Sequence, residues 1–555
     1  MLLSFASLHR AWGEKLTMKP SLFVAMLLTS SLVLAACSNN VASPATYTVS
    51  GTVVNLAGTN GGLVLQDNLN DTLPVNANGS FIFAKTVASG SSYNVAVSVQ
   101  PSNPAQTCGV TSGSGIATAD ITNVQVNCGH NEWAWMKGPN SVSVNGTYGT
   151  LGVPDPNNNP GGRQTPVTWT DASGKLWLFG GYGLDSSGTV LPMNDVWEYS
   201  AGQWAWMGGS NLGGQNGTYG ALGVPAMSNI PGARYEAASW TDSSGALWLF
   251  GGNGFDSAGT EAALNDMWKY SDGEWTWMGG SDVAKQLGIY GTLGAPATNN
   301  TPGARFGTVT WVDSSGNFWL FGGFGYDSNG SNGMLNDLWK YSNGQWTWES
   351  GSDVANQNGT YGIQGMPTPN NTPGARYWAA VWTDSSGNLW LFGGTGYGAS
   401  GSSGFLNDLW KYSNGQWTWV SGPSAISQPG VYGPEGVAAS GNIPGSRQLA
   451  VSWTDSSGNF WLFGGNGIDS ASAIGLLNDL WKYSDGQWTW MSGTKVINQQ
   501  GVYGSPGVLA PGNIPGARFE IGHWVDAEGN LWLFGGYGAA GGTEGDLGDL
   551  WMYMP

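Results

Sequence analysis

The sequence predicts an all-β protein, a six-bladed β-propeller preceded by a small β-sandwich. A pair of glycines recurs six times at an interval of 71 residues, beginning at Gly180, Gly251, Gly322, Gly393, Gly464 and Gly535. Each interval contains four short apolar segments separated by turn residues, which is the strand content of one propeller blade. The 555 residues also include 91 glycines and 32 tryptophans, and only 10% of them are charged. This composition favours a turn-rich β protein with a large aromatic core over a disordered chain.

The first 36 residues have the features of an export signal. Lys19 precedes an apolar run from Leu22 to Ala36, which is short for a membrane-spanning helix. The run leads into Leu-Ala-Ala-Cys at 34–37, which resembles the lipobox of bacterial lipoproteins. That resemblance implies cleavage before Cys37, lipidation of its sulfur, and a lipidated tether over residues 37–45. An ordinary secretory signal, with Cys37 as a spare thiol, is the alternative.

These features predict a protein of the bacterial cell envelope that a lipid anchor holds at a membrane. Ser38 stands where an aspartate would indicate retention at the inner membrane, so the outer membrane is favoured. The net charge of −18 argues against nucleic acid as a partner, because binding to phosphate backbones requires a basic surface. We expect a monomer whose ligand is a glycan or another protein.

Residues 46–129 predict a small β-sandwich that serves as a spacer. Apolar and polar residues alternate at 47–53, 80–83 and 93–97, and turn residues separate these segments. The pattern resembles the immunoglobulin-like and carboxypeptidase-regulatory-like modules of bacterial surface proteins. Cys108 and Cys128 are the two cysteines that remain after Cys37, and in an exported protein they predict a disulfide.

Residues 131–555 contain the repeats, and the second copy shows the unit. Strands are expected at 234–240, 247–250, 267–270 and 275–277. An apolar strand that ends in Gly-Gly, followed by a tryptophan and a tyrosine at set distances, resembles the kelch repeat, and six such repeats imply a six-bladed β-propeller. The period exceeds the ~50 residues usual for kelch, and the excess lies in loops, chiefly between a fourth strand and the next first strand. Long loops on one face predict a binding surface there.

The phase of the repeats predicts how the ring closes. A Trp-x-Trp strand begins at Trp133, before the first complete copy, and the last copy has no such strand of its own. Residues 132–136 should therefore complete the last blade by pairing with residues 550–553. This pairing would leave no open sheet edge at the junction.

Charged residues of two kinds recur in every copy. An arginine opens each first strand, at Arg163, Arg234, Arg305, Arg376, Arg447 and Arg518. An aspartate opens each third strand, at Asp195, Asp266, Asp337, Asp408, Asp479 and Asp549. In an up-and-down sheet these positions lie at the same end, so each pair can form a charge-assisted hydrogen bond. The alternative makes the arginines ligand-binding residues, as a ring of free guanidinium groups that receives an anionic ligand.

Positions that differ between the copies are candidates for a specific site. The residue two positions after each arginine varies most, and it is Thr165, Glu236, Gly307, Trp378, Leu449 or Glu520. First strands line the central channel, so we expect these side chains near its mouth. The sequence predicts a pocket there, with Trp378 as a ligand-binding residue and with Glu236, Glu520 and His523 as candidate catalytic residues. Drift at solvent-exposed positions would produce the same divergence.

The sequence predicts no metal and no cofactor. Loops at Asp185, Asp256, Asp327 and Asp469 resemble weak calcium loops, but Gly398 and Ala540 take that position in two other copies. These loops offer too few ligands for calcium, so we expect plain turns. Some kelch propellers resemble galactose oxidase, whose copper site needs a tyrosine crosslinked to cysteine and two histidines. The repeat array has no cysteine and one histidine, which excludes that chemistry.

Two functions remain open from the sequence. The favoured one is a non-catalytic binding or scaffold propeller that presents its loops to a glycan or a protein. The alternative is a cofactor-free carbohydrate epimerase or mutarotase, similar to the kelch-type sialic acid mutarotases. In that case Glu236, Glu520 and His523 are the available general acid–base groups.

Overall fold

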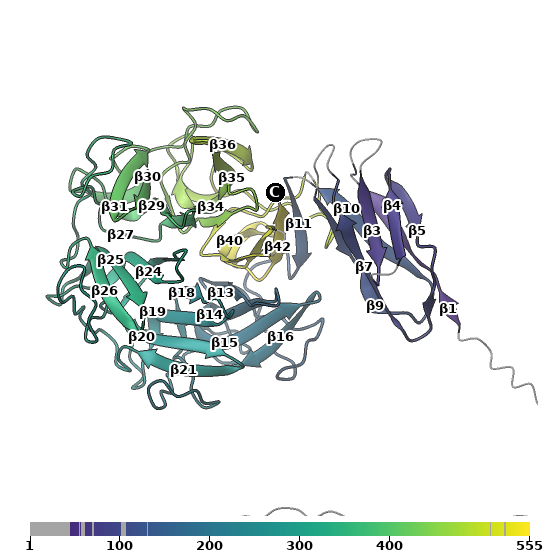
Figure 1. The fold of residues 1–555 in the computed structure, drawn as a ribbon, viewed down its shortest axis with the longest axis horizontal. Helices are drawn as coiled ribbons and strands as arrows, with labels where there is room; N and C mark the ends of the chain where they lie inside the picture. Colours follow the sequence, from purple (N-terminus) through teal and green to yellow (C-terminus); the bar gives the residue numbers. More distant parts are fainter. Residues whose placement is uncertain are drawn as a thin grey trace, which may run out of the picture.

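The structure is a computed structural model that describes residues 45–54, 56, 62–68, 71–101, 107–129, 131–510, 512–526 and 529–555. The predicted export signal, the lipidation site Cys37 and the tether up to residue 44 lie outside these residues. All regular elements of the described residues are β-strands, and none of these residues forms a helix long and apolar enough to cross a membrane. Figure 1 shows a ring of sheets with a smaller pair of sheets beside it. The chain is thus an all-β protein in which a β-sandwich precedes a six-bladed β-propeller.

The β-sandwich contains two four-stranded sheets, with strand orders β5-β2-β10-β8 and β4-β3-β7-β9, and a short β1-β6 pair. Its strands are β1 (Thr46–Tyr47), β2 (Val49–Val54), β3 (Leu63–Asp67), β4 (Asp71–Val75), β5 (Gly79–Ile82), β6 (Val87–Ala88), β7 (Ser92–Val99), β8 (Thr107–Thr111), β9 (Ser114–Ile116) and β10 (Ile121–Gly129). Alternating side chains fill the space between the sheets. In β2, for example, Val49 and Val53 are fully buried whereas Val54 faces solvent.

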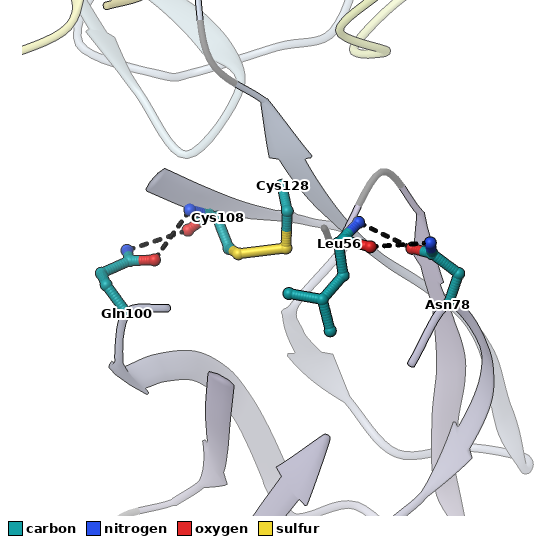
Figure 2. Close-up of a disulfide and its surroundings, with 5 residues drawn as sticks. All are labelled: Leu56, Asn78, Gln100, Cys108 and Cys128. Carbon is teal, nitrogen blue, oxygen red and sulfur yellow. Dashed lines mark hydrogen bonds between the residues drawn. A yellow bond between two sulfur atoms is a disulfide. The ribbon is translucent and has the colours of Figure 1, made fainter. Parts of the chain in front are cut away.

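The predicted disulfide between Cys108 and Cys128 is present, and it joins directly opposed residues of β8 and β10 (Figure 2). The amide side chain of Gln100 holds the backbone of Cys108, donating to its carbonyl at 3.1 Å and accepting from its N–H at 2.7 Å. Asn78 holds the backbone of Leu56 through two similar bonds of 2.7 and 2.9 Å. These amides satisfy backbone groups that lie outside the strand ladders.

The repeats form six blades, numbered 1 to 6 along the chain. Blade 1 contains β12 (Arg163–Gln164), β13 (Val167–Thr170), β14 (Leu176–Leu184), β15 (Val190–Ser200) and β16 (Gln203–Gly208). Blade 2 contains β17 (Arg234–Tyr235), β18 (Ala238–Thr241), β19 (Leu247–Phe255), β20 (Glu261–Ser271) and β21 (Glu274–Gly279). Blade 3 contains β22 (Arg305–Phe306), β23 (Val309–Val312), β24 (Phe318–Tyr326), β25 (Asn332–Ser342) and β26 (Gln345–Ser350).

The remaining blades follow the same order. Blade 4 contains β27 (Arg376–Tyr377), β28 (Ala380–Thr383), β29 (Leu389–Tyr397), β30 (Ser403–Ser413) and β31 (Gln416–Ser421). Blade 5 contains β32 (Arg447–Gln448), β33 (Val451–Thr454), β34 (Phe460–Ile468), β35 (Ile474–Ser484) and β36 (Gln487–Ser492). Blade 6 contains β37 (Arg518–Phe519), β38 (Gly522–Val525), β39 (Leu531–Phe534), β40 (Tyr537–Ala540), β41 (Thr543–Asp546), β42 (Leu550–Met554) and, from the start of the array, β11 (Glu132–Lys137).

The predicted seam is confirmed. Strand β11 pairs antiparallel with β42, which places Trp135 opposite Trp551 and Trp133 opposite Tyr553. The sandwich lies beside this seam, since β10 leads into β11 (Figure 1). Asn127 of β10 donates a hydrogen bond of 3.0 Å to the Leu509 carbonyl of blade 6. The seam thus connects the two ends of the array and also positions the sandwich.

Aromatic side chains form the core between adjacent blades. The phenylalanine before each Gly-Gly pair packs against the outer-strand tryptophan of the next blade, with ring centroids 4.9 to 5.5 Å apart. The six pairs are Phe179–Trp275, Phe250–Trp346, Phe321–Trp417, Phe392–Trp488, Phe463–Trp133 and Phe534–Trp204. Contacts of this kind contribute about 0.5–1.5 kcal/mol each beyond the burial of apolar area. These recurring tryptophans therefore pack in the core between adjacent blades.

The first strand differs from its prediction. It was expected to be continuous over 234–240, but it stops at Tyr235 and resumes at Ala238. The residue at the break has a positive φ in every blade: 43° at Thr165, 55° at Glu236, 62° at Gly307, 60° at Trp378, 53° at Leu449 and 60° at Glu520. A left-handed residue cannot continue the pleat of a strand. The break is therefore a repeated feature of the fold.

The long loop between blades does not form a free surface loop along its whole length. In each copy it runs along the outer strand of the blade that follows it, and a glycine N–H donates to a tryptophan carbonyl of that strand at 2.7 to 2.8 Å. These bonds are Gly152–Trp206, Gly223–Trp277, Gly294–Trp348, Gly365–Trp419, Gly436–Trp490 and Gly507–Trp135. The loop thus covers the exposed edge of each sheet. Without this pairing the outer strand would leave backbone groups unpaired.

Candidate functional site

The arginine and aspartate of each blade form a buried cluster. In blade 3, Arg305 and Asp337 make two parallel hydrogen bonds of 2.7 and 2.8 Å. Tyr290 and Trp339 each donate to the same aspartate at 2.7 Å. Arg305 also donates to the Gly322 carbonyl at 3.1 Å. Three residues thus donate four hydrogen bonds to the Asp337 carboxylate, which is what a buried charge requires.

All six arginines are paired in this way, and their side chains are at most 1% exposed. The pairs are Arg163–Asp195, Arg234–Asp266, Arg305–Asp337, Arg376–Asp408, Arg447–Asp479 and Arg518–Asp549. The alternative of a ring of free guanidinium groups is therefore not what the structure shows. A guanidinium group buried inside a blade needs a carboxylate beside it to balance its charge. None of the six arginine side chains reaches the channel.

The glycine pair serves the same cluster. Gly251 has a φ of 64°, and a Cβ atom there would lie 2.7 Å from the Arg305 carbonyl oxygen of the next blade and 2.8 Å from that of Leu264. Its own carbonyl accepts a hydrogen bond of 2.9 Å from Arg234. The Gly-Gly pair is thus required for close approach of backbones and does not form a phosphate loop.

The residues at the six strand breaks meet around the channel. Backbone hydrogen bonds join neighbouring blades there, from the N–H of one break to the carbonyl of the adjacent one. These bonds are Thr165–Glu520 at 2.7 Å, Gly307–Glu236 at 3.1 Å, Trp378–Gly307 at 2.9 Å and Leu449–Trp378 at 3.0 Å. The side chains most variable between copies consequently project from one belt, in which these bonds join four of the six neighbouring pairs.

A cavity of about 180 Å³ lies at this belt, and we refer to it as the channel cavity. The belt residues and His523 line it, together with the small residues Ala237, Ala379 and Ala450. Trp378, Glu236, Glu520 and His523 are thus brought together, although they come from three different blades. Each of the four side chains is partly exposed.

Trp378 reaches across one blade to contact Glu236. Its indole Nε1 donates a hydrogen bond of 2.7 Å to Oε2 of Glu236 in blade 2. The indole passes over Gly307 of blade 3, where a Cβ atom would lie only 2.7 Å from Nε1. The ring of Tyr377 packs against the indole, with centroids 4.0 Å apart. Glycine at 307 therefore provides the space that this bond needs.

Both glutamates of the cavity hold protons more tightly than usual. Burial raises the pKa of Glu236 to about 7, although the bond from Trp378 opposes this change. Burial raises the pKa of Glu520 to about 8, and the negative charges of Glu236 and Asp546 add to the effect. Near neutral pH the pair therefore shares protons, as expected for like charges in a partly desolvated site.

The histidine of the cavity stays neutral. Burial lowers the pKa of His523 to about 4, and a hydrogen bond with the Ile521 backbone only partly offsets this. His523 occupies the position five residues after the blade arginine, where the other copies have Thr168, Ser239, Thr310, Val381 and Ser452. Hydroxyls there join blades, for example Thr168 to the His523 carbonyl at 2.6 Å. This second row of positions gives an additional sequence signal for His523, which is the residue that departs most from the small side chains of the other copies.

The calcium-like loops are turns. Oδ1 of Asp185 accepts from the N–H groups of Ser187 and Thr189 at 2.8 and 3.0 Å, and Oδ2 accepts from Gly213 at 3.2 Å. Both oxygens of the Asp185 carboxylate thereby accept hydrogen bonds from backbone N–H groups. No group of three or more histidine, cysteine, aspartate or glutamate side chains in the described ranges is placed to hold a metal ion.

No known protein family matches the sequence, and no curated protein has a significantly similar one. Solved structures with a similar fold include the following three. YjhT is 14% identical, with a TM-score of 0.39 over 73% of this chain and 96% of that one. A fungal alcohol oxidase in complex with copper is 13% identical, with a TM-score of 0.37 over 74% and 76%. A protein of unknown function from Dyadobacter fermentans is 9% identical, with a TM-score of 0.40 over 77% and 99%.

Proposed function

We propose that this protein is a lipid-anchored binding propeller of the bacterial cell envelope, and that its channel cavity receives one sugar unit of a glycan. One observation carries the proposal: the indole of Trp378 is held in place by Glu236 at the edge of a cavity that also contains Glu520. An aromatic face suits the apolar face of a sugar ring, and carboxyl groups bind its hydroxyls.

The size and rigidity of the cavity support a small ligand. Its volume of about 180 Å³ is below the range of pockets for drug-sized molecules, so one ring fits better than a chain. The belt of backbone hydrogen bonds fixes the positions from which the contacting side chains project. Little conformational entropy is then lost on binding.

A glycan array probed with the mature protein tests this function. We expect binding to a defined set of glycans, loss of that binding in Trp378→Ala, and no change in Leu222→Ala. Leu222 is a matched apolar control because it lies 59% exposed in an outer loop, away from the cavity. Equal binding by the Trp378 variant and the wild type would contradict the proposed site.

The anchor has its own test, since it rests on the lipobox resemblance at residues 34–37. We expect the wild-type chain to label with fatty acid and to sediment with the outer membrane. The Cys37→Ala chain should do neither, while glycan binding by the propeller is unchanged. A Cys37→Ala chain that still carries fatty acid would refute the anchor and leave the binding site untouched.

A second candidate is cofactor-free acid–base catalysis on a sugar in the same cavity. The raised pKa values of Glu236 and Glu520 favour it, because groups that titrate near neutral pH exchange protons most effectively. Anomer exchange of reducing sugars, sialic acid included, can be followed by NMR. Catalysis predicts faster exchange with wild type than with Glu236→Gln, whereas a pure binding protein leaves the exchange rate unchanged.

A further inference from the structure

We infer that the channel cavity selects a glycan unit that carries a protonated amino group. This inference rests on the proposed function, namely that the cavity is the sugar site, and it adds the chemical class of the sugar. Three properties of the cavity favour an amine: its carboxyl groups without a cationic partner, its aromatic wall and one buried hydroxyl.

The carboxyl groups of the cavity have no cationic partner. None of the residues that line it is a lysine or an arginine. The six arginines of the first strands are committed to the aspartates inside the blades. Among the described residues, none makes a hydrogen bond or an ion pair with the Glu520 carboxyl group. The Glu236 carboxyl group accepts a hydrogen bond only from the neutral indole of Trp378. An ammonium group would supply the missing positive charge.

The aromatic wall suits a cation as well as a sugar face. Trp378 and Tyr377 form a packed pair beside the carboxyl groups, and the indole lines the cavity. The face of an indole attracts ammonium groups, most strongly where water is excluded. Carboxylates next to an aromatic face therefore bind an organic cation better than a neutral hydroxyl.

Thr165 provides an independent observation. This residue lines the cavity, and its side-chain oxygen is buried and makes no hydrogen bond to any other described residue. A buried hydroxyl without a partner costs about 1–3 kcal/mol, so a ligand that bonds to it gains affinity. An ammonium group has three N–H donors. Glu236, Glu520 and Thr165 offer three acceptors to it.

The titratable neighbours of the cavity do not change this charge balance. His523 is neutral, and burial raises the pKa of Tyr235 and of Tyr377, so neither ring carries charge near neutral pH. Asp546 adds a further carboxyl that Gln164 contacts. The cavity is therefore neutral to negative, which disfavours a sugar acid. When one ammonium group enters, the pair of glutamates gives up about one of the protons that it holds, because one positive charge balances one carboxylate, and this proton leaves to solvent.

Three oligosaccharides with the same β-1,4 backbone test the inference by calorimetry at pH 6.5. They are the glucosamine tetramer, the N-acetylglucosamine tetramer and cellotetraose, which differ at carbon 2 by an ammonium, an acetamide and a hydroxyl group. We expect the glucosamine tetramer to bind at least about tenfold more tightly than the other two. Titrations in two buffers of different ionisation enthalpy should show release of about one proton per bound amine and none for the neutral sugars.

Two variants test whether the preference for the amine arises in the channel cavity. Glu520→Gln should lower the affinity for the glucosamine tetramer about tenfold and leave that for cellotetraose within about twofold. Glu435→Gln removes an exposed carboxylate from an outer loop and should change neither. Proton release by the unmodified protein is a readout that does not depend on how well a variant folds.

The outcomes separate the two proposals. If cellotetraose binds as tightly as the amine and no proton is released, the amine inference is overturned and the sugar site stands. If none of the three sugars binds and the glycan array is also blank, both proposals fail. A trilysine peptide that binds more tightly than all three sugars would overturn the glycan assignment.

Discussion

Trp378 and Glu236 stand 142 residues apart in the sequence, two blades from each other around the ring, and are joined by a hydrogen bond of 2.7 Å. The contact skips blade 3 because Gly307 has no side chain to obstruct it. The equivalent position holds glutamate in blade 2, glycine in blade 3 and tryptophan in blade 4. The bond thus depends on the residue at this position in three blades, namely Glu236, Gly307 and Trp378.

Replacing Gly307 with alanine should break this contact. A Cβ atom at 307 would lie 2.7 Å from Trp378 Nε1, and its positive φ of 62° adds backbone strain. We expect a loss of about 1–2 kcal/mol in the free energy of unfolding, a changed near-UV signal from tryptophan, and weaker glycan binding. Gly294→Ala is the matched control, because φ is 73° there but nothing lies within 4 Å. Wild-type binding by Gly307→Ala would show that the indole position does not matter.

The protein should lose stability as the pH rises from 5 to 9. The unfolded chain releases the protons of Glu236 and Glu520 near the ordinary value of 4.5, whereas the folded protein keeps them up to about pH 7 and 8. The folded state therefore binds more protons in this window, and raising the pH favours unfolding. We expect about 1 kcal/mol per glutamate, allowing for partial exposure. Urea unfolding across this range should give a flatter profile for the Glu236→Gln, Glu520→Gln double variant than for Glu435→Gln.

Breaking a buried arginine–aspartate pair should destabilise the propeller strongly. Asp337→Ala leaves Arg305, Tyr290 and Trp339 without their acceptor, so we expect a loss of about 3–5 kcal/mol. The surface pair of Lys411 and Asp384 is the comparison, and Lys411→Met should cost about 1 kcal/mol or less. Chemical denaturation monitored by tryptophan fluorescence measures both. Similar losses for the two variants would refute a structural role for the buried cluster.

Removing the disulfide should destabilise the sandwich more than the propeller. The bond between Cys108 and Cys128 closes a segment of 20 residues, for which loop entropy predicts about 3 kcal/mol. We expect the Cys108→Ala, Cys128→Ala chain to show an earlier transition for the sandwich and an unchanged one for the tryptophan-rich ring. Adding a reductant to the wild type should reproduce this shift, and adding it to the variant should have no effect.

The sequence was sufficient to predict features that depend on periodic residues. The six recurrences at an interval of 71 residues predicted the number of blades. The early Trp-x-Trp strand predicted the pairing of Trp135 with Trp551. The recurrence of arginine and aspartate at one end of the sheet allowed a buried pair. Each of these inferences follows from residue type and phase alone.

Other features depend on backbone conformation, which side-chain identity does not reveal. Glutamate, tryptophan and leucine rarely adopt positive φ, so nothing at Glu236, Trp378 or Leu449 indicated a break in the first strand. Only Gly307 gave such a signal. The outer loops cover the sheet edges through backbone hydrogen bonds, which composition cannot show. The bond from Trp378 to Glu236 depends on the side-chain direction that this break creates.

The pairing of β11 with β42 also imposes an order on folding. The outer strand of the last blade, β11, is synthesised before all other strands of the propeller. It has no strand to pair with until residues 550–554 have been synthesised. Contacts between such distant segments form late, since chain entropy opposes them until most of the protein is in place. Five blades can assemble in succession, but the ring remains open until β42 pairs with β11.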